Sequence, residues 1–308
     1  MSNEKKTGPD WKKATADAQR KAADAANSVK NKIVNVMDVD GNGKVELNDI
    51  IIMALKVPGI QIDREEFLRK EFFKNHPQCV IDEIIATTPA RAGISMQEVD
   101  KLANDTIAFE RNCVSGISAA LGMPGGVAMV ATIPADIAQY YGYMLRAAQK
   151  LMYLYGFPAM DVNEKGQTFD SETMNILTIC LGVMYGVAGA NNALKSIAKA
   201  LGNGVEKQLL KQALTKGTIY PIVKNVAKWF GVRMTKDVFA GFFKHAIPLV
   251  GGAIGFGLTY ASFKPCCDML QKSLRKTKLA DPSYEGDDDD IPVEAVIVEE
   301  QDEETEGA

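Results

Sequence analysis

The sequence predicts an all-α protein, a multi-helix bundle with glycine-rich apolar core helices that follow a helix-loop-helix segment. Three observations lead to this fold class. Apolar residues recur at helical spacing through most of the chain, and helix-start and helix-stop signals separate the periodic stretches. Three long segments carry no charged side chain and many small residues. With 308 residues, 46% hydrophobic and 24% charged, the chain suffices for two modest domains or one large helical domain.

The first segment, residues 1–22, is expected to be a basic arm that is helical or disordered. From Trp11 onward its apolar residues, most of them alanine, fall at helical spacing with lysine and arginine on the other faces. Such an arm is able to lie on an anionic lipid surface. Because its apolar face is weak, a simple lead-in to the next segment is the favoured interpretation.

Residues 23–58 are predicted to form a helix, an acidic loop at 38–49, and a second helix that Pro58-Gly59 stops. The loop places oxygen-bearing side chains at alternate positions, and hard oxygen ligands are the ones that calcium prefers. Gly43, at the sixth position, permits the sharp turn that such a loop needs. The candidate ligands are Asp38, Asp40, Asn42, the backbone carbonyl of Lys44, Glu46 (directly or through a water) and Asp49.

This loop resembles an EF-hand calcium loop, which implies Ca²⁺ as the bound cofactor. Asp49 stands where such loops usually carry a bidentate glutamate. Its shorter side chain is expected to weaken calcium relative to magnesium, with a Kd on the order of 10⁻⁶ to 10⁻⁴ M. The alternative is a surface turn rich in Asp, Gly and Asn. A second loop is weakly suggested at 161–172, but Lys165 occupies a ligand position there, so an acidic connection between helices is expected instead.

Residues 59–280 are expected to form the main helical domain. Its first part consists of scaffolding helices with breaks at His76-Pro77 and Thr88-Pro89, and Ser95 with Glu98 has the spacing of a capping box.

Uncharged runs of 24, 22 and 18 residues follow, at 112–135, 173–194 and 246–263. Two interpretations stay open. Proline, glycine and asparagine inside the runs favour buried core helices with at most peripheral membrane contact, and the alternative is true membrane insertion.

Several separated motifs of this domain resemble the EcsC protein family. They are Gly122-Met123-Pro124-Gly125-Gly126, Ile133-Pro134-Ala135-Asp136, Tyr155-Gly156, Gly231-Val232-Arg233-Met234-Thr235-Lys236 and Ile247-Pro248-Leu249-Val250-Gly251-Gly252. The resemblance spans roughly residues 68–276. It implies a helical bacterial protein with no established catalytic activity, and the calcium loop lies outside the shared part. Thr259-Tyr260 stands where an asparagine is expected in many relatives, which puts a polar role of that position in doubt.

No catalytic residues are expected. Asp136 follows Pro134 at the head of a predicted helix, where capping is its favoured role and general acid-base catalysis the alternative. His76 and His245 are the only histidines, too few for a histidine-based metal site or catalytic triad. The five cysteines lack metal-ligand spacing, and Cys266-Cys267 are expected to be small core residues rather than a redox pair.

The charge is strongly polarised along the chain. Residues 281–308 hold 13 acidic and no basic side chains, which leaves 35 basic against 26 acidic residues, a net charge of +9, in the rest. A basic body points to an anionic partner such as a lipid surface or nucleic acid, or to the tail itself. A lipid surface is favoured over nucleic acid because aromatic residues are sparse in the basic segment 195–236. The tail is expected to be disordered, with an apolar centre at 291–298 that is either solvated with the rest or docks on a protein partner.

The expected function is that of a calcium-binding, non-enzymatic protein that acts as a binding or scaffolding factor at or near a membrane. The alternative is a soluble helical protein that binds or transforms a small apolar ligand in its core, with calcium purely structural. Residues 1–6 contain no apolar run that would act as a secretion signal. An intracellular location, cytoplasmic or peripheral to the cytoplasmic membrane, is therefore expected.

Overall fold

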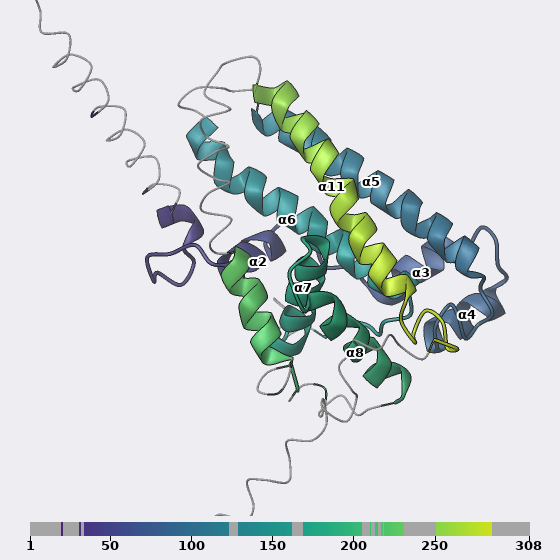
Figure 1. Ribbon diagram of the computed structural model, residues 1–308. Coiled ribbons are helices and arrows are strands. Elements are labelled where there is room, and N and C mark those ends of the chain that lie inside the picture. Colours follow the sequence, from purple (N-terminus) through teal and green to yellow (C-terminus); the bar gives the residue numbers. More distant parts are fainter. Residues whose placement is uncertain are drawn as a thin grey trace, which may run out of the picture.

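The computed structural model describes residues 34–122, 129–161, 169–204, 219–230 and 251–284, together with residues 20, 31, 210, 213, 214 and 217. Apart from one β-bridge residue, Phe169, all regular structure in these ranges is helical (Figure 1). The helices are α2 (Leu47–Leu55), α3 (Arg64–Phe72), α4 (Gln78–Ala86), α5 (Met96–Gly122), α6 (Met129–Leu154), α7 (Ser171–Met184), α8 (Ala190–Gly202), α11 (Gly251–Arg275) and residues 220–230. The predicted all-α multi-helix bundle is confirmed.

Three long helices form the frame of the bundle. α5 and α11 run side by side, and α6 packs against both of them (Figure 1). α2 packs on α6, α3 packs on α4 and α6, and α7 and α8 pack on each other and on α11. The buried apolar side chains form one cluster that includes Met37 and the buried face of α2. The segments on both sides of the acidic loop are therefore anchored in the same core as the long helices.

Helix boundaries in the first part of the bundle follow local sequence signals. The predicted breaks at His76-Pro77 and Thr88-Pro89 both fall between helices. The Glu98 N–H donates to the Ser95 side-chain oxygen at 3.2 Å, so Ser95 caps α5 as predicted. The arm at 1–22 lies outside the described residues except for residue 20.

The uncharged run 173–194 divides between two helices. α7 ends at Met184, and the chain turns through Gly186 and Gly189, whose φ angles are 67° and 84°, before α8 begins. Among the described residues, no helix has the combination of length and apolar character needed to cross a membrane.

A glycine of this run also allows a close helix contact. A Cβ atom added at Gly182 would lie 2.7 Å from a methyl carbon of Val226, so only glycine lets these two helices pack so closely. The small residues of this run thus serve dense packing in the core.

Candidate metal centre

The acidic loop 38–49 lies between two helix ends. Helical residues 34–37 precede it, and the Asp38 N–H donates to the carbonyl oxygen of Val34 at 2.8 Å. Glu46 is the residue that precedes α2, and its N–H donates to Oδ2 of Asp49 in the first turn of that helix at 2.8 Å. Asp38 is thus positioned by the end of one helix and Asp49 by the start of the next.

Three carboxylates converge in this loop. One oxygen from each of Asp38, Asp40 and Asp49 lies within 4.8 Å of the other two. Asp40 is exposed, whereas Asp49 is only 1% exposed. Like charges at this separation repel one another, and a bound cation removes that repulsion. In the described part of the chain, no other cluster of three acidic, histidine or cysteine side chains has this spacing.

Backbone N–H groups of the loop orient these carboxylates. Asp38 Oδ2 accepts a hydrogen bond from the Gly43 N–H at 2.7 Å, and Asp38 Oδ1 accepts one from the Asn42 N–H at 3.1 Å. The same Asn42 N–H lies 3.0 Å from Oδ1 of Asp40. Gly41 and Gly43 have φ angles of 74° and 82°, in the left-handed region that glycine adopts without strain. The two glycines thereby let the backbone curl around the acidic side chains.

The Asp38 carboxyl has a pKa below its usual value. Desolvation raises this pKa, whereas hydrogen bonds from the backbone N–H groups of Gly43, Asn42 and Gly41 lower it. Asp38 is therefore ionised at neutral pH, which is the form that binds a cation.

The other predicted ligands, Asn42, Lys44 and Glu46, do not belong to the cluster of three carboxylates. Asn42 Nδ2 donates to Oδ2 of Asp40 at 2.9 Å, and Asn42 Oδ1 accepts from the Lys44 N–H at 2.9 Å, so the amide is already tied into the loop. Lys44 is exposed, and the carboxylate of Glu46 does not join the cluster of three. The position of the Glu46 carboxylate outside the cluster suits a ligand that reaches calcium through a water.

The donor set selects for hard cations. Carboxylate, amide and carbonyl oxygens fit calcium or magnesium, and the absence of histidine and cysteine from the loop disfavours zinc and copper. Both oxygens of Asp49 also accept backbone hydrogen bonds, Oδ1 from the Val39 N–H at 3.0 Å and Oδ2 from Glu46. This double role of Asp49 was not foreseen from the sequence.

Side chains of α6 fasten the segment that follows α2. Arg146 Nη1 donates to the carbonyl oxygen of Gly59 at 2.7 Å. Gln149 Nε2 donates to the carbonyl oxygen of Ile60 at 2.9 Å, and Gln149 Oε1 accepts from the Ile62 N–H at 3.1 Å. Gln149 is fully buried, so water cannot replace these bonds if they break. We call these contacts the α2 clamp.

The α2 clamp continues into a buried ion cluster. Glu110 on α5 is fully buried, and its Oε1 accepts from Arg146 Nε at 3.0 Å and from Lys150 Nζ at 2.5 Å. Its Oε2 is buried and has no hydrogen-bond partner among the residues that the structure describes. Sequence reasoning missed this cluster, although Arg146, Gln149 and Lys150 share one face of an otherwise apolar helix. A continuous series of contacts therefore links the acidic loop to α5 and α6.

Asp136 does not cap a helix, and that prediction was wrong. α6 begins at Met129 and continues through Pro134, so Asp136 lies beyond the first turn. Its Oδ1 accepts a hydrogen bond from Ser118 Oγ at 2.7 Å, and Ser118 Oγ in turn accepts one from Thr259 Oγ1 at 3.2 Å. These contacts join α5, α6 and α11, and they give Thr259 the polar role that the sequence put in doubt.

His76 Nε2 lies 2.9 Å from Oε1 of Glu98, a local contact at the start of α5, and His245 lies outside the described residues. Cys266 and Cys267 are reduced cysteines on α11, the first half-buried and the second fully buried. Burial raises the pKa of Cys267 well above its usual value, which disfavours the reactive thiolate. The predicted core role is confirmed for Cys267.

The weakly suggested second loop lies mostly outside the described part, which lacks residues 162–168. Asp170 accepts a hydrogen bond from the Thr173 N–H at 2.8 Å and so caps α7. Its carboxylate therefore serves the helix start, as expected of an acidic connection between helices.

Comparisons with protein-family models, with curated proteins and with solved structures found no match. The family resemblance and the calcium loop therefore stay predictions.

Replacing Glu110 by glutamine is expected to lower the free energy of unfolding by about 3 kcal/mol, because Arg146 and Lys150 then lose the carboxylate that pairs with them. Chemical denaturation followed by circular dichroism measures the change. The control is Asp82→Asn, which removes an exposed partner of Arg69 and should cost less than about 1 kcal/mol. Equal losses for the two variants would contradict the structural role of the buried cluster.

Proposed function

We propose that this chain binds calcium at loop 38–49 and acts as a calcium-responsive, non-enzymatic binding or scaffolding protein at or near a membrane. The observation that carries the proposal is the convergence of Asp38, Asp40 and Asp49 within 4.8 Å. Backbone N–H groups already hold these carboxylates in place, so little further ordering is needed when the ion binds.

The expected affinity is moderate. Asp49 has a short side chain whose two oxygens both accept backbone hydrogen bonds, which favours binding to calcium through one oxygen rather than two. A Kd on the order of 10⁻⁶ to 10⁻⁴ M follows from such a ligand set. Occupancy of a site in this range changes with the calcium level, whereas a tight buffer site stays filled.

The contacts of α2 support a responsive role. Asp49 lies in the first turn of α2, and the chain that leaves this helix is held by Arg146 and Gln149 of α6. A ligand that fixes Asp49 therefore also favours one placement of α2 on the bundle.

The non-enzymatic part of the proposal is supported by how the acidic and histidine side chains are used. Glu110 pairs with two cations, Asp136 accepts from Ser118, and His76 contacts Glu98. Glu110 and Asp136 make contacts between helices, and His76 makes a contact at the start of α5.

The membrane part of the proposal is supported by charge. The chain before residue 281 carries a net charge of +9. A lysine or arginine near an anionic lipid surface contributes roughly 1 kcal/mol of attraction, so a few contacts suffice for binding. Association of this kind is peripheral and sensitive to salt.

Calcium titration calorimetry tests the binding site. The wild-type chain is expected to bind one calcium ion in the loop, and Asp38→Ala should abolish the heat, because the first ligand and its bonds to Gly43 and Asn42 disappear. Calcium at about 100 times the Kd should also raise the free energy of unfolding by about 2.7 kcal/mol in the wild type alone. Asp82→Asn, an exposed acidic residue elsewhere, is the matched control. Equal heats for wild type and Asp38→Ala would exclude the site.

Fractionation of the native host tests the membrane proposal. Membranes are washed with high salt plus a chelator and then extracted with detergent. Peripheral, electrostatic binding predicts release in the first wash, because salt screens exposed charges beyond about 8 Å. Release only in detergent would contradict the peripheral proposal and favour insertion of the uncharged runs. Absence from membranes would favour the alternative, a soluble protein that binds a small apolar ligand.

A further inference from the structure

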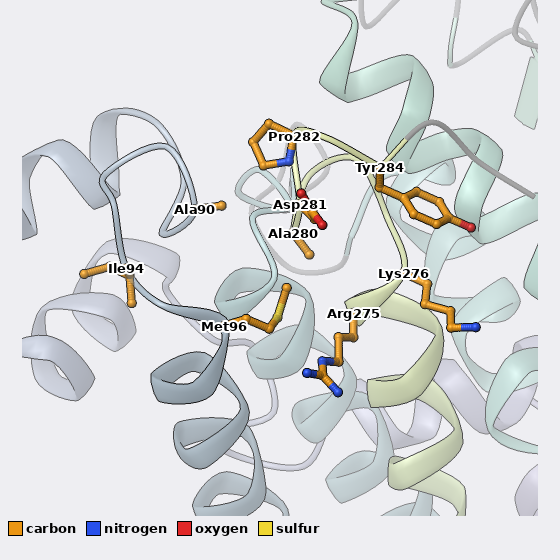
Figure 2. A pocket seen from close by; sticks show the side chains of 9 residues that line it. All are labelled: Ala90, Ile94, Met96, Arg275, Lys276, Ala280, Asp281, Pro282 and Tyr284. Carbon is orange, nitrogen blue, oxygen red and sulfur yellow. The ribbon is translucent and has the colours of Figure 1, made fainter.

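A surface cavity of about 700 Å³ lies between the segment that joins α4 to α5 and the carboxyl end of α11 (Figure 2). Its lining is partly apolar, with Ile94 and Met96 on one side and Ala280 and Pro282 on the other. Ile94 and Ala280 are each only 8% exposed, so they form the floor rather than the rim.

The chain is anchored at the edge of this cavity up to Tyr284. The Asp281 N–H donates to the carbonyl oxygen of Thr277 at 2.9 Å, and the Tyr284 N–H donates to that of Asp281 at 2.9 Å. The hydroxyl of Tyr284 accepts from Lys195 Nζ at 3.2 Å. Tyr284 itself lines the cavity (Figure 2). The acidic tail, residues 285–308, therefore begins at the cavity.

Two cations at the carboxyl end of α11, Arg275 and Lys276, line the cavity. Lys272, Arg275, Lys276 and Lys278 are the only charged residues between positions 269 and 280. Arg275 pairs with Asp100 at 3.2 Å, whereas the three lysines have no ion-pair partner among the described residues.

One anion, Asp281, also lines the cavity. Hydrogen bonds from the side chain and backbone of Ser283 lower the pKa of Asp281, so it is ionised. Of the two cations in the lining, Lys276 has no ion-pair partner among the described residues, so its charge remains available to an acidic segment. A segment complementary to this cavity carries acidic residues for the cations and apolar residues for the floor.

The tail has this composition. Residues 285–308 contain twelve acidic and no basic side chains, and six aliphatic residues lie together at 291–298. Six residues lie between Tyr284 and Ile291, and the seven Cα–Cα steps span at most about 24 Å when extended, which is enough for the chain to fold back. A short tether of this kind gives an effective concentration on the order of millimolar, so weak contacts suffice.

We propose that segment 291–298 of the chain's own tail occupies this cavity, with the flanking acidic runs near Lys276. The tail then covers cations that would otherwise face an anionic surface. This proposal does not depend on calcium binding.

Photo-crosslinking in the full-length chain tests the proposal. A benzophenone amino acid replaces Val296, and crosslinked peptides are mapped by mass spectrometry after irradiation. Intramolecular crosslinks to residues 90–96 or 276–284 are expected. Their yield should fall at least fivefold in Lys276→Glu, because an exposed attractive charge is reversed, and also in Ile94→Asp, because a charge enters the apolar floor. Circular dichroism confirms that both variants are folded.

The same probe at Thr305, beyond the apolar segment, is the matched control and should crosslink to the cavity much less. Crosslinks mainly to other surfaces would overturn the proposal. Crosslinks mainly between two copies of the chain, or a yield that Lys276→Glu leaves unchanged, would overturn it equally.

Discussion

Arg146 makes the contact on which the proposed calcium response depends. Its guanidinium holds the carbonyl oxygen of Gly59 and the buried carboxylate of Glu110 at once, so the end of α2 is tied to the centre of the α5–α6 pair. Gly142 makes room for this arrangement, because a Cβ atom there would lie 3.1 Å from the side chain of Ile60. A charge-assisted bond in a buried site is strong only while both partners stay in place, which fixes the geometry.

The short length of α2 makes this contact relevant to the acidic loop. α2 has nine residues, with Asp49 in its first turn and Gly59 four residues beyond its end. The loop and the α2 clamp therefore hold opposite ends of the same short helix. The coupling is reciprocal. The free energy by which a bound ion stabilises the α2 clamp equals the free energy by which the intact clamp strengthens ion binding. The measured consequence of calcium would then extend to α6.

Some of this arrangement was predictable because its causes are local in sequence. The capping of α5 by Ser95, and the acidic loop between two helices, involve residues only a few positions apart. The contact between Gln149 and Ile60 spans 89 positions and that between Thr259 and Ser118 spans 141, so no local pattern predicts them. Asp136 was misplaced because Pro134 suggested a helix start, whereas this proline lies inside α6.

Hydrogen exchange at the Ile62 amide tests the central claim, which is the coupling of the loop to α6 through α2. This amide donates to the buried Gln149, so it exchanges when the α2 clamp opens. Saturating calcium should slow its exchange at least about fivefold in the wild type, since coupling free energies of this kind are typically about 1 to 3 kcal/mol. No change is expected in Asp38→Ala. An unchanged exchange rate in wild-type protein that has bound calcium would contradict the account.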